Sequence, residues 1–416
     1  MAGAERGERP VPGFSRFWWG QAVSGFGSGI TLLALQALVV VTLGGSAVQV
    51  GWLASARWLP YLVLGLVVGA LVDRGRRRPV MVVTDLTRAV LLSLVPLAWG
   101  LDLLTFPLLL VVVVLLGTAS LVNDAASMSF LPRLVPRERL QRAHARLDGA
   151  DAVAQTAGPA VAGALVRLVG APLAVLVDAL TYLVSAVAVA TLPRGVEGAR
   201  TPAVRRSVPS LPGEVRDGVR WVYGASGLAR LAVATHVWFA GQAVLLVALP
   251  TFAFLQLRLS AWQLGLVLAA GGVGALAGAT LSTAVGRRLG TGGTIIGAHV
   301  VSAAAVAVMV AAALPASTEA AVLVLAAGQL GHGWAMGVSN SHEMSYRQAL
   351  TPDPLQARTG TTMRSLNRAV LVVVSPLAGL AADRLGDGQV LGVAALVFCV
   401  SALVLALSPF RHVRVG

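Results

Sequence analysis

The chain has 416 residues, of which 56% are hydrophobic and only 12% are charged, and its mean hydropathy is +0.78. A soluble protein carries about 25% charged residues, so this composition excludes the ordinary soluble class. The net charge is +14, and all 32 basic residues are arginines. Outside Arg57, Arg167, Arg258 and Arg384, they fall in the tails and loops predicted below to be cytoplasmic, or at their membrane edges. This asymmetry is typical of membrane topology and argues against nucleic-acid binding.

Twelve apolar stretches are long enough to cross a bilayer, which takes about twenty residues of helix. The longest polar interval divides them six and six, and it ends in EVRDGVRWVYG, where apolar residues at helical spacing predict an interfacial helix. The stretches lie near 16–42, 50–72, 80–100, 104–130, 148–168, 171–193, 227–255, 262–284, 293–315, 319–341, 362–384 and 388–409.

The segment MSFLPRLVPRERLQRA, beginning at Met128, resembles MSYRQALTPDPLQAR, beginning at Met344, at an offset of 216 residues. The matches include loop residues, so shared apolar composition does not explain them, and they predict two parallel six-helix repeats. We therefore predict an all-α integral membrane fold in the cytoplasmic membrane with both termini cytoplasmic. The expected units are a tail at 1–15, a bundle at 16–193, a linker at 194–226, a bundle at 227–409 and a tail at 410–416.

The second apolar stretch ends abruptly in GALVDRGRRR, residues 69–78. Lipid does not hold such a cluster, so the chain leaves the bilayer there, on the cytoplasmic side. The pattern resembles the loop between helices 2 and 3 of the major facilitator superfamily, which implies a conformational latch. Its acid would face the start of segment eleven, around residues 361–364 with Arg368 nearby, although Arg76 stands where a glycine is usual. The latch residues are Gly69, Asp73, Arg74, Arg77 and Arg78.

The fifth stretch contains Gly158, Pro159 and Gly163, a small-residue pattern similar to the fifth-helix motif of exporters and antiporters in that superfamily. Small residues let helix backbones touch and proline bends a helix, so these three predict a packed hinge between the halves. Residues 130–163, together with LVDALTYLVSAV after them, resemble the subgroup of macrolide-efflux and enterobactin-exporter proteins. Relatives there often carry an acid at the place of Ser28, which implies that this chain carries the proton elsewhere or is coupled differently.

Polar residues within membrane segments are costly and are functional candidates. Arg57 either snorkels to the outer surface or faces the cavity, and Asp85 and Arg88 are expected to pair locally. For proton coupling the candidates are Asp124, Asp151 and His332, where an interhelical hydrogen bond is the alternative role of the histidine. The candidates for lining the cavity are Gln21, Arg57, Asn123, His236, Trp238, Gln242, Gln329 and Trp334.

These features predict a secondary transporter that works by alternating access, with proton-coupled efflux of a hydrophobic or amphipathic molecule such as an antibiotic or siderophore. One alternative is uptake of a polar or anionic metabolite bound by Arg57. Another is a non-transporting membrane partner of a biosynthetic or secretion assembly. No nucleophile–base or metal-ligand cluster and no P-loop lysine is present, so we expect no enzyme, cofactor or metal site. The expected partners are a small-molecule substrate, protons and the lipid bilayer, with a monomer able to function.

Overall fold

The computed structural model describes residues 11, 13–193, 211–224 and 227–414. The described residues form helices joined by short turns, without a strand among them. The long helices are α1 (Phe14–Ala37), α2 (Ala47–Val63), α3 (Gly65–Arg74), α4 (Arg77–Gly100), α5 (Phe106–Leu134), α6 (Leu140–Val169), α7 (Ala171–Ala190), α8 (Leu211–Tyr223), α9 (Ala229–Thr251), α10 (Ala261–Val310), α11 (Thr318–Leu350), α12 (Gln356–Leu385) and α13 (Asp387–Ala406). Shorter turns are η1 (Leu38–Thr42), η2 (Arg137–Arg139), η3 (Phe252–Gln256), η4 (Ala311–Ala313), η5 (Asp353–Leu355) and η6 (Pro409–His412).

Ten helical segments among the described residues are long and apolar enough to cross a membrane, against twelve stretches predicted. Two local features explain the difference. α10 has 50 residues and covers two predicted stretches, because two helices meet directly at a kink at Gly290 (φ +72°). The second stretch is split at Leu64 into α2 with 17 residues and α3 with 10, so neither reaches a spanning length alone.

The two halves repeat local geometry as well as sequence. α1 is followed by the π-helical turn η1, and α9 is followed by the π-helical turn η3. After each turn a serine stands at the start of the next helix, Ser46 before α2 and Ser260 before α10. Both serines form a capping box with a glutamine three residues on. Gly170 and Gly386 both adopt positive φ between the last two helices of their half. These matches support an internal repeat of the two halves.

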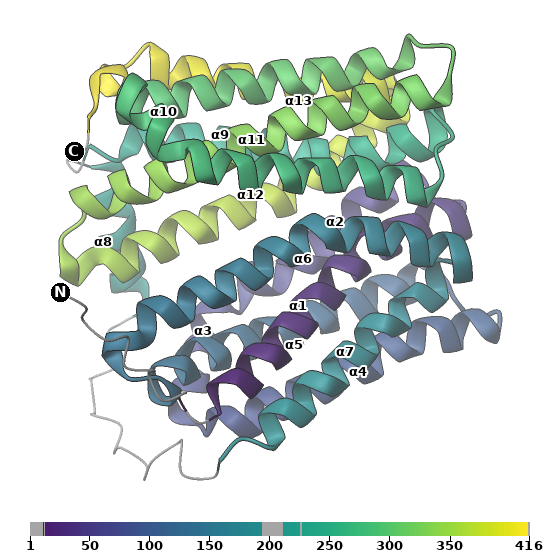
Figure 1. Cartoon of the computed structure of the whole chain (residues 1–416), viewed down its shortest axis with the longest axis horizontal. Helices are drawn as coiled ribbons and strands as arrows, with labels where there is room; N and C mark the ends of the chain where they lie inside the picture. Colours follow the sequence, from purple (N-terminus) through teal and green to yellow (C-terminus); the bar gives the residue numbers. More distant parts are fainter. Residues whose placement is uncertain (1–10, 12, 194–210, 225–226, 415–416) are drawn as a thin grey trace, which may run out of the picture.

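Helices α1–α7 form one bundle and α9–α13 form the other (Figure 1). Both described chain ends and α8 lie at one end of the molecule, called here the terminal end, and the turns after η1 and η3 lie at the far end. α8, where the sequence predicts a helix in the linker, packs against α12. The halves meet where α2 packs against α12 and α6 packs against α10.

Glycines make the contacts between the halves close. A Cβ on Gly51 of α2 would collide with the backbone of Ser375 and Pro376 in α12, and one on Gly163 of α6 would collide with that of Ala261 in α10. These positions lie toward the far end, so the two bundles are joined there backbone to backbone. Many large apolar side chains on the outside of the bundles are exposed, as a lipid-facing surface requires.

Candidate functional site

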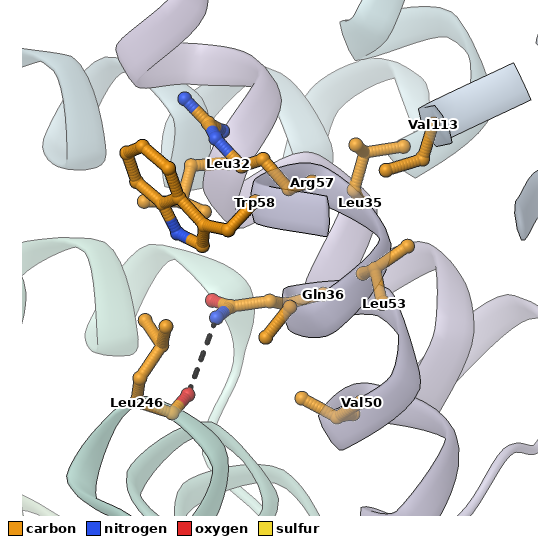
Figure 2. A pocket seen from close by; sticks show the side chains of 10 residues that line it. Leu32, Leu35, Gln36, Val50, Leu53, Arg57, Trp58, Val113 and Leu246 are labelled. Carbon is orange, nitrogen blue, oxygen red and sulfur yellow. Dashed lines mark hydrogen bonds between the residues drawn. The ribbon is translucent and has the colours of Figure 1, made fainter. Parts of the chain in front are cut away.

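An apolar cavity of about 150 Å³ lies between the two halves (Figure 2). Side chains of α1, α2 and α5 line it from the first half, and Leu246 of α9 lines it from the second. Its polar groups come from Gln36 and Arg57, and the indole of Trp58 lies beside them. The Gln36 amide donates a 3.4 Å hydrogen bond to the carbonyl of Leu246, so α1 and α9 are bridged at the cavity.

A second cavity of about 70 Å³ continues from the first, with Arg57 and Trp58 lining both. Among the described residues, Asp178 of α7 is the only acid that lines either cavity. Its side chain is 0% exposed, and it accepts hydrogen bonds from Thr31 at 2.6 Å and Thr181 at 2.9 Å. The sequence marks Asp178 only as one acid in a membrane segment, and the cavity makes it a candidate site residue.

The side chains of Asp124 and Asp151 in the first half are both exposed. Asp124 accepts a 2.7 Å hydrogen bond from the hydroxyl of Tyr61. The guanidinium of Arg368, from α12, lies 4.5 Å from the Tyr61 ring centroid, so this group reaches across to the second half. Asp151 lies beside Gly25 of α1, where an added Cβ would stand 3.1 Å from its carboxylate.

Asn123 takes part in a polar cluster inside the first half. Asp85 and Arg88 form the expected ion pair on α4, and both are buried. The Asn123 amide donates to Asp85 at 3.1 Å and to Thr84 at 2.8 Å, which ties α5 to α4. The side chain of Asn123 therefore bonds within the bundle, and it is not among the residues that line the two cavities.

Of the candidates in the second half, Gln329 and His332 are buried and the others are partly exposed. His332 donates to Gln242 at 3.0 Å, and its ring stacks on Trp238 with the planes 7° apart. His236 donates to Asn367 at 2.6 Å and accepts from Tyr223 of α8, whose pKa is raised by burial, so that the phenol keeps its proton. Gln21, a candidate in the first half, is also partly exposed. Of the eight residues predicted to line the cavity, Arg57 alone lines either of the two cavities described above.

An acid that the sequence analysis did not single out joins the halves at the far end. Asp383 of α12 accepts hydrogen bonds from the Ser46 hydroxyl at 2.7 Å, the Ala47 amide at 2.9 Å and the Val48 amide at 3.3 Å. These amides begin α2, where the positive end of the helix dipole attracts an anion. The carboxylate of one half thus caps a helix of the other.

At the terminal end, the side chains of Asp73 and Arg74 lie outside the described residues, so their contacts stay a prediction. A Cβ on Gly69 would meet nothing within 4 Å among the described residues, so no close helix contact forms at this glycine. Arg77 and Arg78 donate to the backbone carbonyls of Gly75 and Ala190, within the first half.

The predicted hinge of the fifth helix lies in α6. Pro159 is inside the helix, and a Cβ on Gly158 would stand 3.4 Å from Gly29 of α1. Gly158 thus faces its own half while Gly163 faces α10 of the other half. The small residues place α6 against both neighbours at once, and their role as a hinge remains a proposal.

The family model of the Major Facilitator Superfamily matches residues 17–366. The chain belongs to the Major Facilitator Superfamily. It is therefore a multi-pass membrane transporter and not an enzyme, as the sequence predicts.

Curated relatives of this transporter include efflux proteins. The multidrug efflux pump Tap of Mycolicibacterium fortuitum is 30% identical over 376 residues, covering 86% of this chain and 87% of that protein. Tap of Mycobacterium bovis is 30% identical over 272 residues, 63% of this chain and 64% of that protein, so less than two thirds of its length is matched. Macrolide efflux protein A of Streptococcus pyogenes is 28% identical over 232 residues, 54% of this chain and 55% of that protein. The predicted resemblance to macrolide-efflux proteins is confirmed.

Solved structures share the fold at low identity. A bacterial homologue of the iron transporter ferroportin in its inward-facing state superimposes with a TM-score of 0.74 at 17% identity, over 95% of this chain and 98% of that one. The outward-facing state of such a homologue gives a TM-score of 0.61 at 18% identity, over 95% and 99%.

Proposed function

We propose that this transporter expels hydrophobic or amphipathic small molecules from the cell by alternating access, in exchange for protons. The observation that carries the proposal is the apolar cavity between the halves, with a buried carboxylate and an arginine at its inner part. Apolar surface supplies binding to many shapes, and the few polar groups orient the ligand. The efflux relatives support export as the direction.

The terminal end is proposed to be cytoplasmic, because arginines gather in the loops and tails at that end and positive residues mark the cytoplasmic side. In the structure Asp383, Gly51 and Gly163 join the halves at the far end. Closure at the far end is what an inward-facing state requires, since the substrate path then leads only to the cytoplasm. The higher TM-score to the inward-facing neighbour agrees with this state.

The cavity of about 150 Å³ is smaller than the roughly 300–1,000 Å³ usual for a drug-sized ligand. A substrate therefore binds with part of its body in the space between the halves. The residues around it, Leu32, Leu53 and Leu246 among them, favour an apolar body. A polar group of the substrate would lie near Gln36 and Trp58.

Proton coupling needs a group that changes charge between the two states of the cycle. Asp124, Asp151 and His332 were the candidates from sequence. The side chains of the two acids are exposed, and the histidine is stacked on Trp238 within the second bundle. They stay proposals for a proton path toward the cavity.

Uptake of an anionic metabolite is the second candidate, because Arg57 lines both cavities and forms no ion pair among the described residues. Export and uptake differ in the sign of coupling. An anion attracts a proton to the same cavity and travels with it, whereas a cation competes with the proton and exchanges for it.

Everted membrane vesicles test the proposal. Respiration acidifies their lumen, so an exporter that exchanges protons accumulates its substrate inside. We expect accumulation of erythromycin, a macrolide, that collapses on adding an uncoupler, and no such accumulation in vesicles without this protein. If neither erythromycin nor any compound of a drug and metabolite panel moves with the gradient, proton-driven transport is excluded.

A further inference from the structure

Asp178 lies in the membrane interior far from bulk water at either helix end. α7 runs from Ala171 to Ala190, so at about 1.5 Å per residue Asp178 stands roughly 11 Å from one end and 18 Å from the other. Its side chain is fully buried, and the small cavity of about 70 Å³ is the open space beside it. A water molecule takes about 30 Å³, so the cavity has room for about two. A proton reaches Asp178 through that space.

The immediate bonds of Asp178 come from hydroxyl groups rather than from a cation. Thr31 of α1 donates to one carboxylate oxygen and Thr181 of its own helix donates to the other. Among the described residues Asp178 forms no ion pair. Hydroxyl groups rotate, so they donate to the charged carboxylate and accept from the protonated one. The site therefore satisfies both protonation states without moving the backbone.

Two arginines act on Asp178 from the helices around it, Arg88 of α4 and Arg57 of α2. Arg88 is paired with Asp85 and stacks over Tyr182, 4.2 Å from its ring centroid, so its charge is already balanced. Arg57 lines the same cavity as Asp178 and is the positive charge that is left. Among the titratable groups of α7, Tyr182 also lines this cavity, and it is bonded to Ser28 at 3.0 Å.

The geometry points to Asp178 as the carboxylate that carries the proton in exchange for substrate, with Arg57 as its fixed counter-charge. The inference rests on the proposed function and adds the group that couples it. With Asp178 ionised, its charge and that of Arg57 cancel in the shared cavity. With Asp178 protonated, the guanidinium remains and the cavity carries one positive charge. Asp124 and Asp151 are exposed and do not line this cavity, although Tyr61, which donates to Asp124, does line it.

This change of charge sets the class of substrate. A cationic amphipath entering the adjoining cavity is repelled when Asp178 is protonated and accepted when it is ionised, so substrate and proton compete. The competition is reciprocal, because each ligand weakens the other by the same factor. A proton taken up at the far end expels the cation, and loss of that proton at the terminal end readmits one. We assign the substrate as a monocationic amphipath.

The test uses purified full-length protein in liposomes, with erythromycin and ethidium as monocationic probes. Gradient-driven accumulation is measured across a pH difference of one unit, which is worth about 1.4 kcal/mol per proton. In one-for-one exchange this difference sustains about a tenfold ratio of probe concentration inside to outside. Counterflow of each probe is measured at equal pH on both sides, where no proton needs to move. The variants are Asp178→Asn and Asp178→Glu, with Asp387→Asn as the matched control. Asp387 also accepts a hydrogen bond from a buried threonine at 2.6 Å, but it lines neither cavity.

We expect Asp178→Asn to lose the tenfold accumulation at every probe concentration and to show counterflow only with a raised KM, because a neutral side chain leaves the charge of Arg57 to repel the cation. Asp178→Glu, which restores a carboxyl, should recover accumulation, and Asp387→Asn should keep both activities. Accumulation that persists in Asp178→Asn overturns the inference. Loss of counterflow in Asp178→Asn even at saturating probe, with Asp387→Asn active, also overturns it, because the residue is then structural. If the wild-type protein shows no gradient-driven movement of either probe but does exchange them, the proposed proton coupling fails before Asp178 is in question.

Discussion

Asp383 accepts a 2.7 Å hydrogen bond from the hydroxyl of Ser46, 337 residues away in the chain, and this bond joins the two halves at the far end. The same carboxylate also accepts from the first amides of α2. A charged acceptor at a helix N-terminus is strong and directional. It is the counterpart, at the opposite end of the molecule, of the cytoplasmic latch that the sequence predicts around Asp73.

Replacing Asp383 with Asn should let the far end open more often. Hydrogen bonds to a charged group contribute about 1.5–3 kcal/mol, so their loss should make the open far end at least about tenfold more populated. The reporter is a cysteine placed at Ala54, which should then react at least about tenfold faster with an impermeant maleimide added outside. Ala54 lines the larger cavity, and Cys399 is first replaced by Ser. Ser46→Ala, which removes one of the three donors, should give a smaller increase. Equal labelling rates in all three proteins would remove Asp383 from the gate.

Gly163→Ala should slow transport because its methyl group collides with the Ala261 carbonyl of α10. Overpacking of this kind costs about 1–3 kcal/mol, which disfavours the closed far end and lowers the transport rate about fivefold or more. Gly149→Ala on the same helix is the matched control, since a Cβ there meets nothing within 4 Å. Initial rates of erythromycin counterflow decide the matter, and equal rates for the two variants would show that α6 and α10 separate without this contact.

Arg57→Gln should tighten the binding of a cationic substrate. A unit charge at roughly 8–16 Å is worth about 1–2 kcal/mol at an effective dielectric constant of about 20, so we expect Kd for ethidium to fall by about fivefold to thirtyfold. Arg167→Gln removes the same charge from an exposed position and should leave Kd unchanged. Quenching of tryptophan fluorescence reports binding, since Trp58 lies at the cavity. Weaker binding in Arg57→Gln would instead favour the anionic substrate.

Asp73→Asn should lower the turnover number while leaving substrate Kd close to that of the wild type. The predicted latch acts on the conformational change and does not touch the ligand, so its loss alters rates rather than affinity. Asp102→Asn, in the turn between α4 and α5 at the far end, controls for loss of one carboxylate. Transport rates at saturating erythromycin report the turnover number, and equilibrium binding reports Kd. Unaltered turnover in Asp73→Asn would contradict the latch.

Sequence predicted the class, the family and the internal repeat well, because apolar stretches, arginine placement and the loop motifs are local signals. The twelve predicted stretches correspond to ten long helical segments, since α10 contains two of them that meet at the kink at Gly290 and Leu64 divides another into α2 and α3. These are differences in where helices end and not in the path of the chain.

The site was harder to predict, because its residues meet only through packing. Asp178 bonds to Thr31, 147 residues earlier, and Asp383 bonds to Ser46, so neither role is visible in a local pattern. An acid in a membrane segment was the only signal for Asp178. Conversely, Asn123 was a candidate for lining the cavity and His332 a candidate for proton coupling, but the side chains of both bond within their own bundles.

Proton release on substrate binding is the most direct test of the exchange. Purified protein is held in weakly buffered solution at a pH where the cavity carboxylate is protonated, and the pH is followed as erythromycin is added. The wild-type protein should release protons, approaching one per chain, because the cationic substrate and the proton compete. Asp178→Asn should release none. Proton uptake by the wild-type protein, or no exchange at any pH at which erythromycin binds, would contradict proton-coupled efflux through this cavity.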